Sequence, residues 1–242
     1  MDKKIPLNVF LTWNTKKLPY YMNENLMELM RKNQEFKFYF QDDDACRNFI
    51  KKSYSNKILN AYDSLIPGAY KADLWRYCIL YKYGGIYMDI KLQTEDDFKL
   101  INLINEEHFP IDIISDNERP GIWQGFLVCK PKNLILAYCI NEICKNVKNK
   151  YYGITPLSVT GPELVYRVIN YVNNDIYKKS KIRLIRTNNP KIFIAEKDTK
   201  FIRLYYENKP IIKFYENYVW ERKLNKQLHY SELWHRREIF RN

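Results

Sequence analysis

The chain has 242 residues, the size of one ordinary domain. Its 46% hydrophobic residues are enough to bury a sizeable core, which excludes global disorder, and its 7 glycines and 10 prolines exclude collagen-like and linker-dominated chains. With 40 Lys plus Arg against 28 Asp plus Glu, the formal net charge of +12 indicates an acidic partner, such as nucleic acid, a membrane surface or a phosphorylated small molecule.

The first half of the chain alternates between strand and helix patterns. In chain order, we expect a strand at 7–13, a helix at 23–30 capped by Asn23, a strand at 36–40, a helix from the Asp42-Asp43-Asp44 run through 50, and a helix at 58–65. After Pro67-Gly68, a helix at 69–83 with one buried stripe ends at Gly84-Gly85, and a strand at 86–90 follows.

The second half adds further elements of both kinds. We expect strands at 111–115 and 122–129, helices at 134–147 and 162–171, four short β pieces at 182–185, 192–194, 201–205 and 211–214, and a helical tail at 231–240. Strands alternating with helices over the first two thirds indicate an α/β fold with a largely parallel sheet.

Cysteine usage and targeting signals bear on the compartment. The five cysteines are odd in number and contain no C-x-x-C pair, which favours reduced, mostly buried thiols over disulfides or structural zinc. No apolar run approaches the roughly 20 residues of a membrane span, and the first residues do not form a signal peptide. We therefore expect a soluble cytoplasmic protein without a transmembrane segment, acting in the host cytoplasm if the chain is viral.

The most informative stretch runs from Pro67 to Lys91. Asp73 and Arg76 are one helical turn apart and share a helix face, and Asp89 ends the next strand. Ligands of open α/β sheets bind just outside the carboxyl ends of strands, so these three groups can meet in one crevice. Arginine suits phosphates or hydroxyls, and a carboxylate suits a sugar hydroxyl or a divalent cation. A solvated intrahelical pair is the alternative, which the apolar and aromatic surroundings of this helix disfavour.

The segment 69–91 resembles the sugar-binding region of glycosyltransferase family 32, whose pattern is a helix with Asp-x-x-Arg, a Gly-Gly turn and an Asp-x-Asp at the strand end. It is also similar to the core of the large bacterial glucosylating toxins, and the resemblance extends over about 1–165. It implies a GT-A fold, with a Rossmann-like, mostly parallel central sheet flanked by helices. We expect a single domain over 1–242, with a core at about 1–175 and a β-rich and helical part at about 176–242 that closes the donor site.

Three flanking segments agree with this resemblance. The opening strand reaches Thr12 and Trp13, where the family stacks an aromatic residue on the donor base; Thr160-Gly161-Pro162 opens a later helix; and His229 to Trp234 resembles the segment that folds over the donor diphosphate. The resemblance implies that the donor contacts are Trp13, Thr12, Asp73, Arg76, Asp89, Gln124, Ser231 and Trp234, and that the catalytic groups are Asp73, Arg76, Asp89 and Lys91.

Lys91 departs from the family pattern, because the second motif aspartate usually contacts a divalent metal and a protonated lysine cannot. Two interpretations stay open for an active enzyme. Asp89 and His229 hold Mn²⁺ or Mg²⁺ together with the diphosphate, or the Lys91 ammonium partly replaces the cation and neutralises the leaving diphosphate. A third interpretation is an inactive module that binds sugar nucleotides.

The resemblance implies a retaining hexosyltransferase. It would move a sugar from a nucleotide-diphosphate sugar, with UDP-sugars favoured, to a glycan or another acceptor in an α-linkage, as in bacterial or viral glycan biosynthesis. Stabilising the negative charge of the departing diphosphate is the main electrostatic task. A nucleic-acid-binding protein is the alternative that the net charge suggests, but no nucleic-acid-binding motif is present.

Other charged residues are weaker candidates. Asp42-Asp43-Asp44 is more typical of a helix N-terminus than of a metal cluster. Asp116 and Glu118 fall where the fold places acceptor-side residues, Asp96 and Asp97 are expected in a solvated loop, and the basic run from Lys178 to Lys191 is expected on a solvated face. His108 and His235 are expected at the surface.

Overall fold

A computed structural model describes residues 4–95, 97–112, 121–172, 192–198, 201–207, 209–224 and 228–241. Its central sheet has the strand order β2-β1-β3-β7, formed by β1 (Asn8–Thr12), β2 (Lys37–Gln41), β3 (Gly85–Met88) and β7 (Phe126–Cys129). β1 pairs in parallel with β2 and β3, and β7 pairs antiparallel with β3. The predicted α/β class with a mostly parallel central sheet is therefore confirmed.

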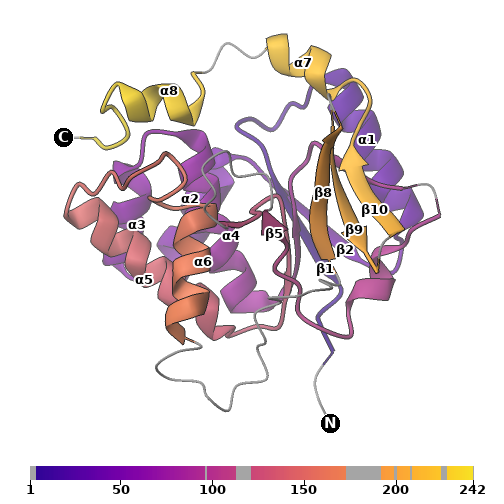
Figure 1. Ribbon diagram of the computed structural model, residues 1–242, viewed down its shortest axis with the longest axis horizontal. Helices are drawn as coiled ribbons and strands as arrows, with labels where there is room; N and C mark the ends of the chain where they lie inside the picture. The colour runs from indigo at the N-terminus through magenta and orange to yellow at the C-terminus, as the bar shows by residue number, and fades with distance from the viewer. Residues whose placement is uncertain are drawn as a thin grey trace.

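Helices pack on both faces of this sheet (Figure 1). They are α1 (Tyr20–Lys32), α2 (Asp43–Ser53), α3 (Asn56–Ser64), α4 (Gly68–Tyr83), α5 (Leu134–Lys148) and α6 (Pro162–Tyr171). Alternate strand residues enter two separate cores, as the period of a strand requires. Phe10 and Tyr87 join the core that α2 to α6 share, whereas Val9, Ile86 and Met88 join the core that contains α1.

A second sheet carries the predicted β-rich C-terminal part. Its order is β4-β10-β9-β8-β5-β6, formed by β4 (Leu92–Thr94), β5 (Ile111–Asp112), β6 (Gly121–Ile122), β8 (Ile192–Asp198), β9 (Phe201–Tyr206) and β10 (Lys209–Phe214). Its pairs are antiparallel except for β5 with β8. Because β4 begins directly after Lys91 and pairs with β10, the C-terminal part is built onto the end of the segment 69–91.

The chain then returns over the first core. α7 (Tyr218–Leu224) lies above α1, and α8 (Tyr230–His235) lies above α2 to α6 (Figure 1). The segment after α8 joins the residues that precede α4: the Ile66 N–H donates to the Ile239 carbonyl (3.0 Å), and the Arg241 N–H donates to that of Ser64 (2.7 Å). Phe240, which is buried, is thereby held in the larger core.

Several element boundaries differ from the prediction. α1 begins at Tyr20 with Pro19 at its N-cap, not at Asn23, because Glu221 of α7 accepts hydrogen bonds from the Tyr21 and Met22 N–H groups (2.8 and 3.1 Å). The strand predicted at 122–129 is two strands with Trp123 to Gly125 between them, and α4 is buried nearly all round rather than along one stripe. The prediction for His108 is wrong, since its side chain is buried: its backbone pairs with Val128 of β7, and its ring lies against that of Tyr206 of β9 (centroids 5.8 Å apart).

The structure also bears on the Asp42 run and the cysteines, and some predicted features lie outside the described residues. The Asp42 carboxylate accepts from the Ala45 N–H (2.9 Å) as the N-cap of α2, which confirms the N-terminus interpretation. All five cysteines are buried and unpaired. In the described part of the chain, no helix has the length and apolar character needed to cross a bilayer. The strand predicted at 182–185, the basic run Lys178 to Lys191, and Asp96, Asp116 and Glu118 lie outside the described residues.

Candidate active site

The Gly-Gly turn sets the path from α4 into β3. Gly84 ends α4 with φ of +63°, and its N–H donates to the Leu80 carbonyl (2.8 Å). Gly85 has φ of +121°, and a Cβ atom there would lie 2.6 Å from the Asn8 carbonyl oxygen. Only glycine meets both demands, a left-handed backbone and close approach to β1. The turn therefore brings the end of β3 back beside the helix that carries Asp73 and Arg76.

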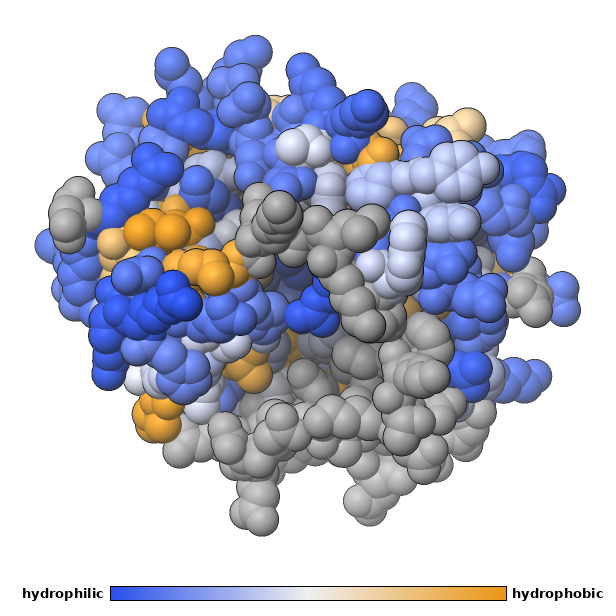
Figure 2. Space-filling view, turned by 90° about the horizontal axis from the view of Figure 1, so that it is seen from above, coloured by the Kyte–Doolittle hydropathy of each residue, from blue (hydrophilic) through white to orange (hydrophobic). Residues whose placement is uncertain are grey.

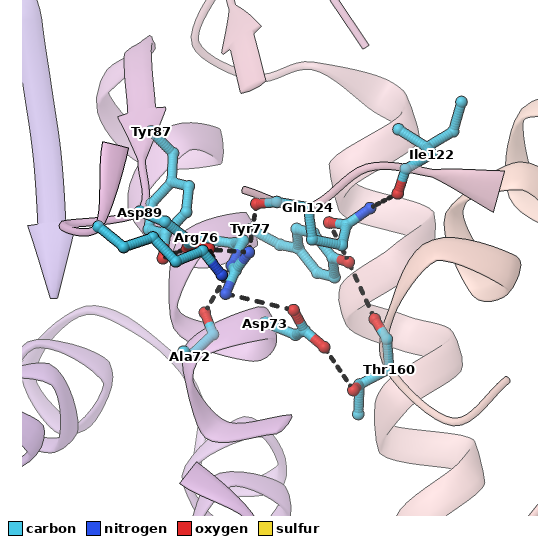
Figure 3. A network of polar contacts seen from close by, with 10 residues as sticks. Ala72, Asp73, Arg76, Tyr77, Tyr87, Asp89, Ile122, Gln124 and Thr160 are labelled. Atoms are coloured by element: carbon cyan, nitrogen blue, oxygen red, sulfur yellow. Dashed lines mark hydrogen bonds and ion pairs between the residues drawn. The ribbon is translucent and has the colours of Figure 1, made fainter. Parts of the chain in front are cut away.

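Arg76 lies between the two aspartates of the motif (Figure 3). Its Nη2 atom is 3.4 Å from Asp73 Oδ1, and its Nη1 atom is 3.8 Å from Asp89 Oδ1. Nη1 also donates to the Gln124 carbonyl, and the guanidinium lies 4.2 Å from the centroid of the Tyr87 ring. The guanidinium is thus a fixed buried cation that joins α4, β3 and the loop before β7.

Asp73 is held from the opposite side by the segment that opens α6. The Thr160 hydroxyl donates to Asp73 Oδ2 (2.7 Å), which ties the Thr-Gly-Pro segment to the motif. The Tyr77 hydroxyl lies 2.6 Å from Gln124 Oε1 and 2.9 Å from the Thr160 carbonyl oxygen, and Gln124 Nε2 donates to the Ile122 carbonyl (2.6 Å). The Gln124 side chain is therefore part of the supporting network (Figure 3).

Asp89 and Lys91 form the more accessible end of this network. The Tyr87 hydroxyl donates to Asp89 Oδ1 (2.8 Å), and the Lys91 ammonium lies 2.9 Å from Asp89 Oδ2. The side chains of Asp89 and Lys91 are 19% and 26% exposed, against 10% and 6% for Asp73 and Arg76. A ligand that enters from solvent therefore meets Asp89 and Lys91 before the buried pair.

The two carboxyl groups are perturbed in opposite directions. Burial raises the pKa of Asp73, and the neighbouring Arg76 and the Thr160 hydrogen bond offset this only in part. Burial also acts to raise the pKa of Asp89, but Lys91, Arg76 and the Tyr87 hydroxyl outweigh it, and the pKa lies below its ordinary value. Asp89 is therefore the anionic partner that keeps Lys91 charged, since it raises the Lys91 pKa despite burial.

An aromatic and basic pocket adjoins the network. It has a volume of about 360 Å³ and is lined by Trp13, Asn14, Thr15, Lys17, Leu18, Pro19, Met22, Tyr218, Glu221 and Arg222. Tyr218 joins the two sites, because the Lys91 ammonium lies 5.9 Å from the centroid of its ring. Asn14 Oδ1 is buried and has no hydrogen-bond partner among the described residues. The pocket thus combines an aromatic stacking surface with cations.

α8 contributes the third part of the predicted donor site. Nδ1 of His229, the N-cap of α8, lies 2.7 Å from Ser231 Oγ, and burial together with Arg222 and Lys91 lowers the His229 pKa. The Trp234 indole N–H donates to the Tyr152 carbonyl (2.7 Å). His229 is therefore within electrostatic reach of both Lys91 and the Trp13 pocket. Seen from above, the face that carries α7 and α8 is mostly hydrophilic and hollowed near its middle (Figure 2).

The structure brings most of these predicted site residues together, but Thr12 makes its contacts elsewhere. Asp73, Arg76, Asp89, Lys91 and Gln124 form one network, and Trp13 lines the adjoining pocket. Thr12 instead donates its hydroxyl to the Gln41 carbonyl (2.8 Å) and lies 3.3 Å from Cys46 Sγ, so it supports the junction of β1 and α2.

Some residues of the site were missed by sequence reasoning. Tyr77 and Tyr87 had a local signal, since Tyr77 is four residues after Asp73 on α4 and Tyr87 shares a strand face with Asp89. Tyr218 and Arg222 had none, because only the return of the chain through α7 brings them to Trp13. The sequence could therefore have predicted the two additional tyrosines of the network, but it could not have predicted the pocket.

The family pattern implies a divalent cation near Asp89, and the residues present do not fit one. Such cations are held by carboxylate oxygens together with phosphate oxygens and water, but the Asp89 carboxylate already faces the Tyr87 hydroxyl and the Lys91 ammonium. At 4 Å, an ammonium repels each unit of positive charge by about 4 kcal/mol at an effective dielectric constant of 20. The expected Mn²⁺ or Mg²⁺ on Asp89 and His229 does not match this donor set.

Part of the chain matches a known protein family, and the fold resembles a solved structure. Residues 19–110 match the family described as glycosyltransferase sugar-binding region containing DXD motif, a range that includes the whole network on α4 and β3. The solved structure of the PaToxG glycosyltransferase aligns with 72% of this chain and 70% of its own, with a TM-score of 0.51 and 13% identity, which is a likeness of fold. Residues 19–110 are therefore similar to the sugar-binding region of glycosyltransferases, and the fold is GT-A-like.

Its relatives come from a virus and from fungi. The chain is 40% identical over 29% of its length to glycosyltransferase L373 of Acanthamoeba polyphaga mimivirus, and 34% identical over 36% to inositol phosphoceramide mannosyltransferase 3 of Schizosaccharomyces pombe. It is 28% identical over 74% to the initiation-specific alpha-1,6-mannosyltransferase of Candida albicans. The matches span 27%, 24% and 58% of these relatives, so this chain corresponds to only part of each.

Proposed function

We propose that this chain transfers a hexose from a nucleotide-diphosphate sugar to a hydroxyl acceptor. The observation that carries the proposal is the buried Asp73–Arg76–Asp89 network, which opens through Lys91 onto the aromatic, basic pocket of Trp13. A sugar needs fixed carboxylates and a guanidinium for its hydroxyls, and a nucleoside diphosphate needs a stacking surface and cations. The two parts of the site offer these groups side by side.

Each group has a distinct task in this proposal. Trp13 stacks on the base, Asp73, Arg76 and Asp89 hold sugar hydroxyls, and Lys91 faces the diphosphate. The C-terminal part, including Ser231 and Trp234 of α8, closes over the donor. Gln124 acts from behind, since its side chain is committed to Tyr77 and Ile122. Together these groups hold the anomeric carbon near an acceptor. Sugar transfer then becomes an effectively unimolecular step within the bound complex.

In the proposed reaction, one bond of the donor breaks and one bond to the acceptor forms. The bond between the anomeric carbon and the diphosphate oxygen breaks, and its electron pair stays on that oxygen. The acceptor hydroxyl oxygen forms the new bond to the anomeric carbon, and its proton passes to the departing diphosphate. The family resemblance supports retention of the α configuration. Negative charge grows on the diphosphate as the bond breaks, so cations placed there lower the barrier.

The identities of the donor and of the acceptor are narrower proposals. UDP-sugars are the first donors to test, and GDP-mannose belongs beside them because two of the relatives are named mannosyltransferases. A glycan-type acceptor, a role in viral or bacterial glycan biosynthesis and action in the cytoplasm stay predictions from the sequence.

Donor hydrolysis and transfer would test the proposal directly. We would incubate the full chain with a panel of UDP- and GDP-sugars, each with Mn²⁺ and with chelator, and measure release of the nucleoside diphosphate. We expect turnover of at least one donor, and a loss of about 100-fold or more in Asp89→Asn, because one anion of the network disappears. A folded Asp89→Asn protein with full turnover would contradict the site assignment, and no turnover or binding of any donor would contradict the function.

Two other functions predict different results. An inactive sugar-nucleotide module would bind a donor without transferring its sugar to water or any acceptor. A nucleic-acid-binding protein, suggested only by the +12 charge, would bind random oligonucleotides with a steep dependence on salt. Tight oligonucleotide binding without donor binding would favour it over the proposal.

A further inference from the structure

The second motif position of this chain carries the opposite charge to the one in the family pattern. The family is described by a DXD motif, and this sequence has Asp89-Ile90-Lys91. Exchanging a carboxylate for an ammonium changes the local charge by two positive units, and a divalent cation brings the same two units. The substitution thus supplies the charge of the cation while it removes one of the cation's ligands.

The backbone at Lys91 is fixed on both sides. The buried Asn25 of α1 donates from Nδ2 to the carbonyls of Ile90 (3.1 Å) and Leu92 (2.9 Å), and the Tyr215 N–H donates to the Lys91 carbonyl (3.1 Å). These bonds anchor the turn to α1 on one side and to the segment after β10 on the other. The lysine is therefore presented from a rigid turn, as a charged group in a preorganised site must be.

The side chain of Lys91 is also placed to act on an anion. Its ammonium lies 5.3 Å from the centroid of the Phe214 ring and 5.9 Å from that of Tyr218, which lines the Trp13 pocket. Among the described residues, only the Asp89 carboxylate accepts a hydrogen bond from it. An ammonium has three N–H donors, so two are left for oxygen atoms of a ligand between Asp89 and the pocket.

We propose that the Lys91 ammonium replaces the divalent cation, so that this chain binds nucleoside diphosphates and transfers the sugar without a metal. The proposal rests on the proposed function and deepens it. Lys91 donates hydrogen bonds to the diphosphate oxygens and stays protonated throughout, so the bonds that break and form are those described above. Asp89 keeps its contacts with the sugar and holds the ammonium in place.

Calorimetric titration of UDP and GDP tests this without any need for turnover. We expect wild-type protein to bind one of them with a Kd that differs by less than about threefold between chelator and Mn²⁺. Lys91→Met keeps the apolar stem and should weaken binding about 10- to 100-fold in both buffers. Lys91→Asp recreates the DXD pattern, and its weak binding in chelator should become at least about tenfold tighter with Mn²⁺.

Two controls separate the possible failures. Lys91→Arg keeps a cation and should keep metal-independent binding, and Lys37→Asp makes the same charge change on the exposed edge strand β2 and should leave binding unchanged. Wild-type binding that requires Mn²⁺ would overturn the inference while the proposed function stands. If neither nucleotide binds under any condition, the proposed function itself fails.

Discussion

At the scale of single residues, the site is a chain of charges that are each satisfied by a named partner. Arg76 touches Asp73, Asp89 and a backbone carbonyl, and Thr160, which lies just before α6, donates a hydrogen bond to Asp73. Buried charges are tolerable only when such partners are present, and loss of one partner leaves the other uncompensated. We therefore expect the loss of a contact in this network to lower stability, which can be measured separately from the ligand binding proposed above.

Thr160→Val tests the structural contribution of the Asp73 contact. The valine keeps the size of the side chain but removes the hydroxyl that donates to Asp73 Oδ2, so we expect the free energy of unfolding to fall by about 1–3 kcal/mol. Thr94→Val is a matched control, because the Thr94 hydroxyl is buried and has no hydrogen-bond partner among the described residues. Urea unfolding should show no loss, or a small gain, in the control; equal losses in both variants would contradict the role of Thr160.

At the scale of elements, the turn between α4 and β3 decides whether the site can form. Gly84 and Gly85 both have positive φ, and Gly85 approaches the Asn8 carbonyl too closely for a side chain. The same helix starts at Gly68, where a Cβ atom would meet nothing within 4 Å. Gly68, at the start of α4, and Gly85, which follows the C-cap of α4 and begins β3, thus have opposite requirements.

Alanine at Gly68 and at Gly85 should therefore have opposite effects on stability. We expect Gly85→Ala to lower the free energy of unfolding by at least about 2 kcal/mol, because it combines a left-handed backbone with overlap at Asn8. Gly68→Ala should be neutral or stabilise by up to about 1 kcal/mol, since alanine is the better helix former. Thermal and urea unfolding would measure both, and a Gly85→Ala protein as stable as the wild type would show that β3 can shift away from β1.

How much of this could be read from the sequence depends on the range of the interactions. α4, the Gly-Gly turn and β3 were predicted closely, because helix caps and strand periods are local signals. The start of α1 was misplaced, since Glu221, about 200 residues away, satisfies its free N–H groups. The Trp13 pocket could not be predicted either, because its far wall is α7. The sequence indicated which residues carry charge, and the tertiary structure determined which of them meet.

At the scale of the whole molecule, the net charge of +12 acts over distances longer than any contact. A positive protein attracts an anionic ligand before it reaches the site, and salt screens this attraction beyond about 10 Å at 0.1 M ionic strength. Lys17 and Arg222 in the pocket, with Lys91 beside it, lie where that field would be focused on a diphosphate.

The association rate of a nucleoside diphosphate should consequently depend on salt. Between about 50 and 500 mM salt, we expect the association rate constant to fall severalfold while the dissociation rate constant changes less. Stopped-flow fluorescence can follow both rates, with Trp13 in the pocket as a reporter. The matching uncharged nucleoside is the control, and its association should be insensitive to salt; equal salt dependence of the two ligands would rule out steering by the protein's charge.

The contact between the residues after α8 and those before α4 has a consequence for the order in which the molecule is made. Ile239 and Arg241 pair with Ile66 and Ser64, and Phe240 fills a place in the larger core. These late residues leave the ribosome more than 150 positions after the helix they support. During synthesis, α4 and its charged side chains are therefore made well before the C-terminal residues that complete their core. A nascent chain in that state exposes apolar surface and is a natural client for chaperones.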